Sequence, residues 1–299
     1  MAESQWYRRE PDAIVRVEIA GHRVVTYSYG TSDDVLLLLN GGPGIPCDYL
    51  REPMIRMVDA GYRVIAFDQL GTGQSDRPDD PTLWTIERYA DEVESIRLAL
   101  GLGRINLLGN SWGGMLAVEY ALAHQDALNT LVLDNTFADT QFQVSESRRL
   151  RAALGPETVA MMQSHEAAGT FDHPEYQAAL TLLEYRHTCR LLEWPAPLLK
   201  SFGDWNRQVK MTLLGPRTFV FDGNLQYWNR LPDLHRLQVP TLVNAGLHDE
   251  VTPASAMRTA RALPNAECHV YRNAAHVPYY ECPDEYFSVL TDFLDRHRR

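Results

Sequence analysis

The sequence predicts an α/β fold with a mostly parallel central sheet, and three observations lead to this prediction. Short apolar runs such as 35–39 and 62–67 alternate with amphipathic segments of helix length. Several of these runs end in glycine-rich turns, as strands that reach one sheet edge commonly do. The alternation stops over residues 137–237 and then resumes. Strands that alternate with helices imply right-handed crossover connections and therefore parallel pairing.

The first expected elements are an antiparallel hairpin and a buried strand. Residues 14–30 alternate between apolar and polar positions and turn at Ala20-Gly21-His22, which predicts a hairpin at a sheet edge. The continuous run 35–39 is typical of a strand buried on both faces. It ends in Asn40-Gly-Gly-Pro-Gly44, whose bare backbone can direct N–H groups at a ligand oxygen. A plain tight loop is the alternative interpretation of this segment.

The clearest functional signal is Gly109-Asn-Ser-Trp-Gly-Gly114, which lies between the apolar run 105–108 and a helix-compatible run over 115–122. A strand, a sharp turn and a helix are the context of a Gly-x-Ser-x-Gly nucleophile elbow, in which the serine hydroxyl stands at the top of the sheet. Without this context a structural turn would be the better interpretation. We therefore expect Ser111 to be a nucleophile.

The remaining elements divide the chain into a core and an insertion. Residues 1–136 and 238–299 are expected to form the α/β core, and 137–237 a helical cap inserted after the sixth strand. The cap carries aromatic residues that either line a pocket or form its own small core, namely Trp194, Trp205, Tyr227 and Trp228. The other core elements are helices over 49–60, 85–100 and 253–263 and from 283 onward, and strands over 62–67, 131–135, 240–245 and 268–271.

Composition argues against several classes of partner. The 28 Lys and Arg against 39 Asp and Glu give a net charge of −11, which disfavours nucleic acid and anionic membrane surfaces. The four cysteines are widely spaced and suit reduced thiols rather than metal ligands. The chain shows neither a signal-peptide core nor an apolar run of membrane-spanning length. We expect a cytoplasmic monomer or small homo-oligomer without metal or cofactor.

A serine nucleophile requires a base and an orienting acid, which follow it in the order acid, then histidine, in sheets of this kind. Asp249 follows the strand predicted over 240–245, and His276 follows the next strand, so both should lie at the edge that carries Ser111. Glu250 and Asp134 are alternative acids. Asp249 is favoured because it stands in a Gly-x-x-Asp turn directly before a helix.

The expected chemistry is acyl transfer. His276 would take the Ser111 proton while the serine attacks a carbonyl carbon, and water would later release the acyl group. The backbone N–H groups of Trp112 and Gly42 are expected to bind the developing oxyanion.

These residues and several longer segments resemble the proline iminopeptidases, or prolyl aminopeptidases, which are α/β-hydrolases. The Asp-Gln-Leu-Gly and Ser-Trp-Gly-Gly-Met-Leu segments are most similar to the corresponding sequences in the branch of amino-acid amide hydrolases, including L-proline amide hydrolases. The resemblance covers nearly the whole chain and implies an α/β-hydrolase fold and a small α-amino acyl amide or short peptide as substrate. The matching segments are Asn40–Gly44, Asp68-Gln-Leu-Gly-Thr-Gly-Gln-Ser75, Gly109–Gly114, Gly246-Leu-His-Asp-Glu-Val-Thr-Pro253, His165–Gly169, Pro174–Tyr176, Arg186–Arg190 and Leu214–Phe219.

Two departures from the family pattern concern substrate recognition. The family usually has histidine where this chain has Asn40, and glutamate where it has Thr218. That glutamate helps to bind the substrate ammonium, so the resemblance leaves Glu250 as the matched acidic partner. The other expected substrate contacts are Gly41, Arg217, Thr218 and Trp228. An esterase or lactonase acting on a substrate without a free amine, and a non-catalytic ligand-binding relative, are the competing hypotheses.

Overall fold

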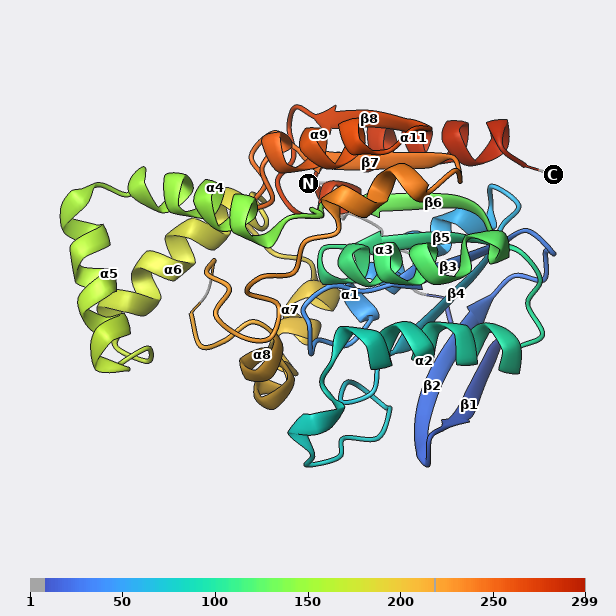
Figure 1. Ribbon diagram of the computed structural model, residues 1–299, viewed down its shortest axis with the longest axis horizontal. Helices are drawn as coiled ribbons and strands as arrows, with labels where there is room; N and C mark the ends of the chain where they lie inside the picture. Colours follow the sequence, from blue (N-terminus) through green and yellow to red (C-terminus); the bar gives the residue numbers. More distant parts are fainter. Residues whose placement is uncertain (1–8, 218, 299) are drawn as a thin grey trace.

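The computed structural model describes residues 9–217 and 219–298, so the predicted contact Thr218 lies outside the described residues. An eight-stranded sheet runs through it in the order β1-β2-β4-β3-β5-β6-β7-β8 (Figure 1). Strand β2 is antiparallel to both of its neighbours, β1 and β4, and β3 to β8 are parallel to one another, which confirms the predicted fold class. The strands are β1 (Ala13–Ile19), β2 (His22–Tyr29), β3 (Val35–Leu39), β4 (Arg63–Asp68), β5 (Ile105–Asn110), β6 (Leu128–Asp134), β7 (Thr241–Gly246) and β8 (Ala266–Tyr271).

Helices cover both faces of the sheet. One face carries α2 (Ile86–Ala99), α3 (Trp112–His124) and α9 (Pro253–Ala262). The other carries α1 (Asp48–Met54), α10 (Pro278–Glu281) and α11 (Pro283–Arg296). Short 3₁₀ turns connect some of these elements, namely η1 (Ile55–Val58), η2 (Pro81–Leu83) and η3 (Gln125–Ala127).

The helix predicted over 49–60 is divided into α1 and η1. Pro53 lies inside α1 and has no N–H with which to continue the α-helical ladder. The carbonyl oxygen of Tyr49, four residues earlier, instead accepts a hydrogen bond of 2.8 Å from the Tyr280 hydroxyl. The tyrosine therefore satisfies a backbone acceptor that the proline leaves open.

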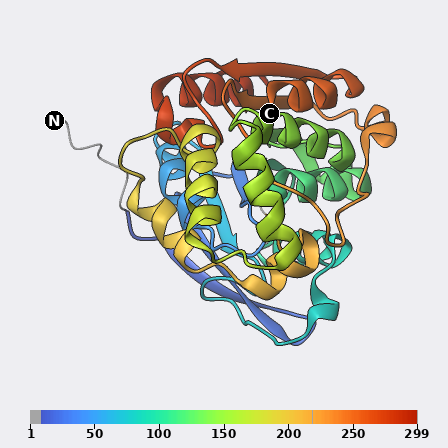
Figure 2. The same cartoon turned by 90° about the vertical axis from the view of Figure 1, so that its left-hand side faces the viewer.

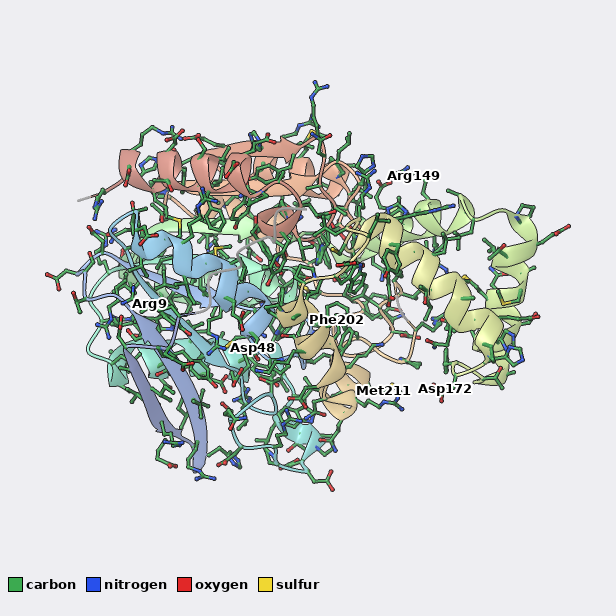
Figure 3. All side chains as sticks on the ribbon, turned by 180° about the vertical axis from the view of Figure 1, so that it is seen from behind. Arg9, Asp48, Arg149, Asp172, Phe202 and Met211 are labelled. Carbon is green, nitrogen blue, oxygen red and sulfur yellow. The ribbon has the colours of Figure 1, made fainter. Side chains whose placement is uncertain are left out.

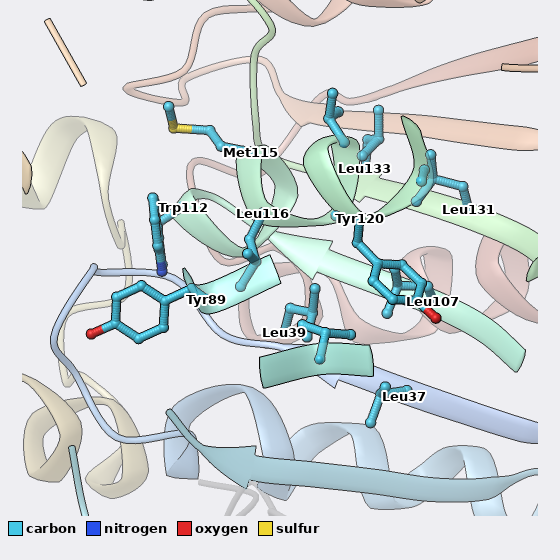
Figure 4. Packing of buried hydrophobic residues seen from close by; sticks show 14 of the residues in the cluster. Leu37, Leu39, Tyr89, Leu107, Trp112, Met115, Leu116, Tyr120, Leu131 and Leu133 are labelled. Carbon is cyan, nitrogen blue, oxygen red and sulfur yellow. The ribbon is translucent and has the colours of Figure 1, made fainter. Parts of the chain in front are cut away.

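Strand β3 shows why the sheet is buried on both faces. All five of its residues are buried, and successive side chains point to opposite sides. Leu37 and Leu39 join the core beneath α2 and α3, where they lie near Leu107 and Leu116 (Figure 4). The alternate residues Leu36 and Leu38 pack into the core beneath α1 and α11.

Between β6 and β7 the chain forms a helical cap at one end of the sheet (Figures 1 and 2). Helices α5 and α6 share a small apolar core of their own that includes Met162, Tyr176 and Leu183. Phe202 of α7 lies where the cap meets the core, whereas Asp172 stands far out in the cap (Figure 3). The cap elements are α4 (Thr140–Ala152), α5 (Pro156–Ala168), α6 (Pro174–His187), α7 (Ala196–Gly203), α8 (Arg207–Leu213) and η4 (Leu231–Arg236).

Within residues 9–217 and 219–298, none of the helices combines the length and the apolar character needed to cross a bilayer.

Candidate active site

Ser111 occupies a strained turn between β5 and α3. Its φ of 56° is left-handed, a conformation that non-glycine residues rarely adopt. A Cβ on Gly109 would lie 2.2 Å from the carbonyl oxygen of Gly113, and one on Gly113 would lie 2.0 Å from that of Leu39. The close approach of α3 to β5 and to the end of β3 therefore requires glycine at both positions.

His276 and Asp249 meet in the loops that follow β8 and β7. The Nδ1 atom of His276 lies 2.7 Å from Asp249 Oδ1, which also accepts a 2.8 Å hydrogen bond from the Val251 N–H. Asn135 Nδ2 donates to the other carboxylate oxygen of Asp249 over 2.5 Å. Asn135 directly follows β6 with a left-handed φ of 54°. No motif in the sequence marks Asn135, because an asparagine after a strand commonly serves only the turn.

Asp134, an alternative acid in the sequence analysis, has a different partner. It ends β6, is fully buried, and accepts a 2.9 Å hydrogen bond from the Tyr286 hydroxyl. Burial raises the pKa of Asp134 to about 7, and the bond from Tyr286 opposes this rise. The carboxylate bonded to His276 is therefore that of Asp249.

The glycine loop after β3 is held by its neighbours. The Gly41 N–H donates to the Tyr49 hydroxyl over 2.6 Å, and that hydroxyl donates to Asn110 Oδ1 over 2.6 Å. Asn40 Nδ2 donates to the Ile45 carbonyl over 2.7 Å, so asparagine can hold this loop in place of the family's histidine. Gly41 thus supports the loop, and its N–H is already occupied.

Two backbone N–H groups near Ser111 have no such partner. Within the described parts of the chain, neither the Gly42 N–H nor the Trp112 N–H has a hydrogen-bond acceptor. Trp112 opens α3, and the first N–H groups of a helix have no acceptor within it. Its indole is fixed by a 2.9 Å bond to Gln69 and by an edge contact with Tyr89 (Figure 4). These two N–H groups are available to a ligand oxygen.

A cavity of about 110 Å³ opens over Ser111 and Gly42 beneath the cap. A smaller adjoining cavity shares Gly42, Ser111 and Glu250 and reaches His276. Aromatic side chains contribute to the wall of the larger cavity, namely Phe137, Phe202, Trp205, Phe219 and Phe221. Its charged lining residues are Glu184, Lys210, Arg217 and Glu250.

Two of these charged residues, Glu184 of α6 and Lys210 of α8, differ from the others in having no close counter-charge in the described parts of the chain. Among the residues that the structure describes, neither has an ion-pair partner within 4.0 Å. Burial raises the pKa of Glu184 to about 7; the charge of Glu250 adds to this rise and that of Lys210 opposes it. Burial lowers the pKa of Lys210, whose Nζ lies 4.8 Å from the centroid of the Trp205 ring. No motif marked either residue in the sequence.

Arg217, by contrast, is paired within the cap. Its Nε lies 2.8 Å from Asp222 Oδ2, so the expected contact residue reaches the cavity with its charge already balanced.

Glu250 faces His276 from the cavity side. Its Oε1 lies 3.5 Å from His276 Nε2, and its Oε2 accepts a 3.2 Å bond from Thr188 of the cap. Burial alone would lower the pKa of His276, but Asp249 and Glu250 outweigh it and raise the value to about 9. Burial also raises the pKa of Glu250, and the charge of His276 opposes that rise.

Trp228 does not line the cavity, contrary to its expected role as a substrate contact. Its indole donates a 2.6 Å bond to Glu119 of α3, and its ring lies 6.4 Å from that of Phe137. Trp228 therefore fastens the end of the cap that leads back into the sheet, which we call its returning end, to the core. It lies behind Phe137, and Phe137 lines the cavity. Of the other cap aromatics, Trp205 lines the cavity, whereas Tyr227 is exposed.

Potential metal ligands gather far from Ser111, where α5 ends and α6 begins. Atoms of His165, His173 and Glu175 lie within 4.8 Å of one another. Local structure accounts for this grouping, because His173 caps α6 through a 3.4 Å bond from the Glu175 N–H and His165 Nδ1 lies 2.8 Å from the Thr170 hydroxyl. We therefore assign these side chains a role in the structure of the turn.

Comparison with known proteins places this arrangement in a family. Residues 34–283 match the family described as alpha/beta hydrolase fold. The chain is 32% identical over 272 residues to a proline iminopeptidase of Saccharolobus solfataricus, covering 90% of this chain and 87% of that protein. It superposes on the crystal structure of VinJ with a TM-score of 0.92 at 34% identity, covering 96% of this chain and all of that one. The proline iminopeptidase of Mycobacterium smegmatis gives a TM-score of 0.88 at 31% identity, covering 95% and 98%. The chain therefore belongs to the α/β-hydrolases, within the proline iminopeptidase family of serine hydrolases.

Proposed function

We propose that this protein hydrolyses the amide bond between a small acyl group that bears a free amine and its leaving amine. The substrate would be an amino-acid amide or the N-terminal residue of a short peptide. The main support is that His276, bonded to Asp249 over 2.7 Å, shares a cavity with Ser111 beside the unoccupied N–H groups of Gly42 and Trp112. Nucleophile, base, acid and oxyanion donors are the parts that acyl transfer requires.

The proposed reaction has two halves. His276 Nε2 accepts the Ser111 proton while Oγ bonds to the carbonyl carbon, and Gly42 and Trp112 donate to the resulting oxyanion. One such donor typically contributes about 3 kcal/mol to transition-state stabilisation. His276 then gives its proton to the leaving nitrogen as the C–N bond breaks, which leaves an ester on Ser111. Water, deprotonated by the same histidine, hydrolyses this ester and restores the serine.

Recognition of the free amine is supported by the charges of the cavity wall. Arg217 is balanced by Asp222, which leaves Lys210 against the two carboxyl groups of Glu184 and Glu250. At a pH above the pKa values of both carboxyl groups, one ammonium group faces two carboxylates in this wall. The ammonium group of a substrate would balance the remaining negative charge. Glu184 thus offers, from α6, a second acid in place of the one that the family carries at the position of Thr218.

A panel of four substrates tests this proposal: proline amide, prolyl p-nitroanilide, the N-acetylated p-nitroanilide and a simple p-nitrophenyl ester. We expect the free-amine p-nitroanilide to exceed its N-acetylated counterpart at least tenfold in kcat/KM. Equal rates would contradict ammonium recognition, and turnover of the ester alone would instead favour an esterase. Ser111→Ala should abolish turnover and labelling by a fluorophosphonate probe.

The role of Glu184 is tested separately. Glu184→Gln should raise KM for the free-amine substrate and leave that of the N-acetylated substrate nearly unchanged. Glu157→Gln is the matched control, because this substitution makes the same change of charge in the exposed first turn of α5. An identical shift for both substrates would assign Glu184 to the packing of the cap rather than to recognition.

A further inference from the structure

The imidazole of His276 lies between two carboxylates, one at each ring nitrogen. Asp249 lies 2.7 Å from Nδ1 and Glu250 lies 3.5 Å from Nε2. When it is ionised, Asp134 at the end of β6 also favours the charged ring, and only 9% of the histidine side chain is exposed. Across the described residues, Ser111 makes no hydrogen bond to this ring. The nitrogen that should accept the serine proton thus faces Glu250.

This arrangement favours the imidazolium. Glu250 attracts a proton on Nε2, and Asp249 attracts a proton on Nδ1. In the free protein, both ring nitrogens of His276 are therefore held in their protonated form. The pKa of about 9 for His276 expresses the same balance. An imidazolium has no lone pair with which to accept the Ser111 proton, and therefore cannot act as the base.

The two carboxylates differ in how freely they can change partner. Asp249 is bonded to His276, the Val251 N–H and Asn135, and its side chain is fully buried. Among the described residues, Glu250 has one further side-chain donor, Thr188 at 3.2 Å, and a quarter of its side chain is exposed. Asp249 is therefore a fixed counter-charge, whereas Glu250 can be engaged by a molecule in the cavity.

The groups that face Glu250 make a cation the suitable occupant. Glu184 carries the same sign, the charge of Glu250 is felt at Glu184 across the cavity, and the cation whose charge acts on Glu184 is Lys210. A second cation that binds Glu250 removes one of the two counter-charges of His276, and the histidine proton is then released to the solvent.

We propose that Glu250 couples recognition of the substrate amine to activation of the base. In the free protein, Glu250 keeps His276 protonated. When the substrate binds, its ammonium group forms an ion pair with Glu250, so that His276 loses its proton and Nε2 can accept the proton of Ser111. The inference rests on the proposed function of the same site. It makes Glu250 a specificity-determining residue that acts on the chemical step as well as on binding, because a substrate without an amine meets a histidine that is still protonated.

Opposite effects on two substrates test the coupling. In Glu250→Gln, p-nitrophenyl acetate should react at least tenfold faster at pH 7, because the midpoint of its pH–rate profile moves down by one unit or more. Turnover of prolyl p-nitroanilide by the same variant should fall. A gain with one substrate and a loss with the other is not what damaged folding produces. Glu157→Gln, the same charge change at a distance, should alter neither profile.

A direct titration completes the test. The imidazole of His276 can be followed by ¹⁵N NMR in Ser111→Ala protein with and without Glu250→Gln, using the wild-type melting temperature as a check on folding. We expect a lower midpoint without the carboxylate. An unchanged midpoint, or an unchanged ester profile, would overturn the coupling even if prolyl turnover falls. The proposed function fails by a different result, namely equal rates for free-amine and N-acetylated substrates in the wild-type protein.

Discussion

The side-chain amide of Asn135 donates a 2.5 Å hydrogen bond to Asp249, the carboxylate that contacts His276. The same amide reaches the Ala275 carbonyl, one residue before His276, over 3.2 Å. One asparagine at the end of β6 therefore orients both the acid after β7 and the loop after β8. A charge-assisted bond of this kind typically contributes about 1.5–3 kcal/mol.

Asn135→Gly should lower kcat about tenfold to a hundredfold, since each 1.4 kcal/mol corresponds to about a factor of ten. Glycine suits the left-handed φ of 54° and removes only the side chain, so the turn itself should persist. Steady-state kinetics and a thermal melt on the same sample separate the two effects. An unchanged kcat would mean that Asp249 is held adequately by the Val251 N–H alone.

Gly113→Ala should destabilise the fold by about 3 kcal/mol or more, because overpacking against a rigid neighbour is costly. The new methyl would lie 2.0 Å from the Leu39 carbonyl oxygen, a backbone atom of a central strand. Gly103→Ala is the matched control, because a Cβ there meets nothing within 4 Å. Urea denaturation of both variants measures the difference, and equal free energies of unfolding would contradict the close approach of α3 to the end of β3.

Asp134→Asn should stabilise the protein increasingly as the pH rises from about 4 to about 7. Burial raises the folded-state pKa of Asp134 from 3.8 to about 7, so in this window the folded state binds more protons than the unfolded state. The wild type then loses stability as the pH rises, and asparagine, which does not ionise, avoids that loss while its oxygen still accepts from Tyr286. Denaturation at pH 4.5 and pH 7.5 tests the sign, which a constant difference would contradict.

Trp205→Phe should reduce kcat by up to about tenfold, the effect of losing one neutral hydrogen bond. The Trp205 indole donates a 2.7 Å bond to the Pro43 carbonyl and so ties the cap to the loop that carries Gly42. Trp194→Phe is the control, because its 3.1 Å bond to Cys189 stays within the cap. If both variants behave alike, the effect belongs to the cap as a whole rather than to the glycine loop.

The sequence predicted those parts of the site that depend on local order along the chain. Ser111 and Gly113 are neighbours in one turn, and the loops with Asp249 and His276 each follow an apolar run that shows the end of a strand. Glu184 and Lys210 could not be predicted, because they are ordinary polar residues on two cap helices whose relative placement only the folded chain defines. Trp228 shows the converse, since its aromatic character indicated a pocket whereas the folded cap turns it toward Glu119.

The contact that fastens the returning end of the cap has a consequence for the evolution of this protein. Asp139, at the start of the cap, forms a β-bridge with Asn229 near its end, and the Thr140 N–H donates to the Trp228 carbonyl over 3.0 Å, so the chain leaves the core for the cap and returns to it at adjacent positions. An excursion with its two ends side by side can change length and content without shifting any strand. Natural variation or protein engineering can therefore exchange the cap as a module, and with it the choice of substrate, while the residues around Ser111 keep their places.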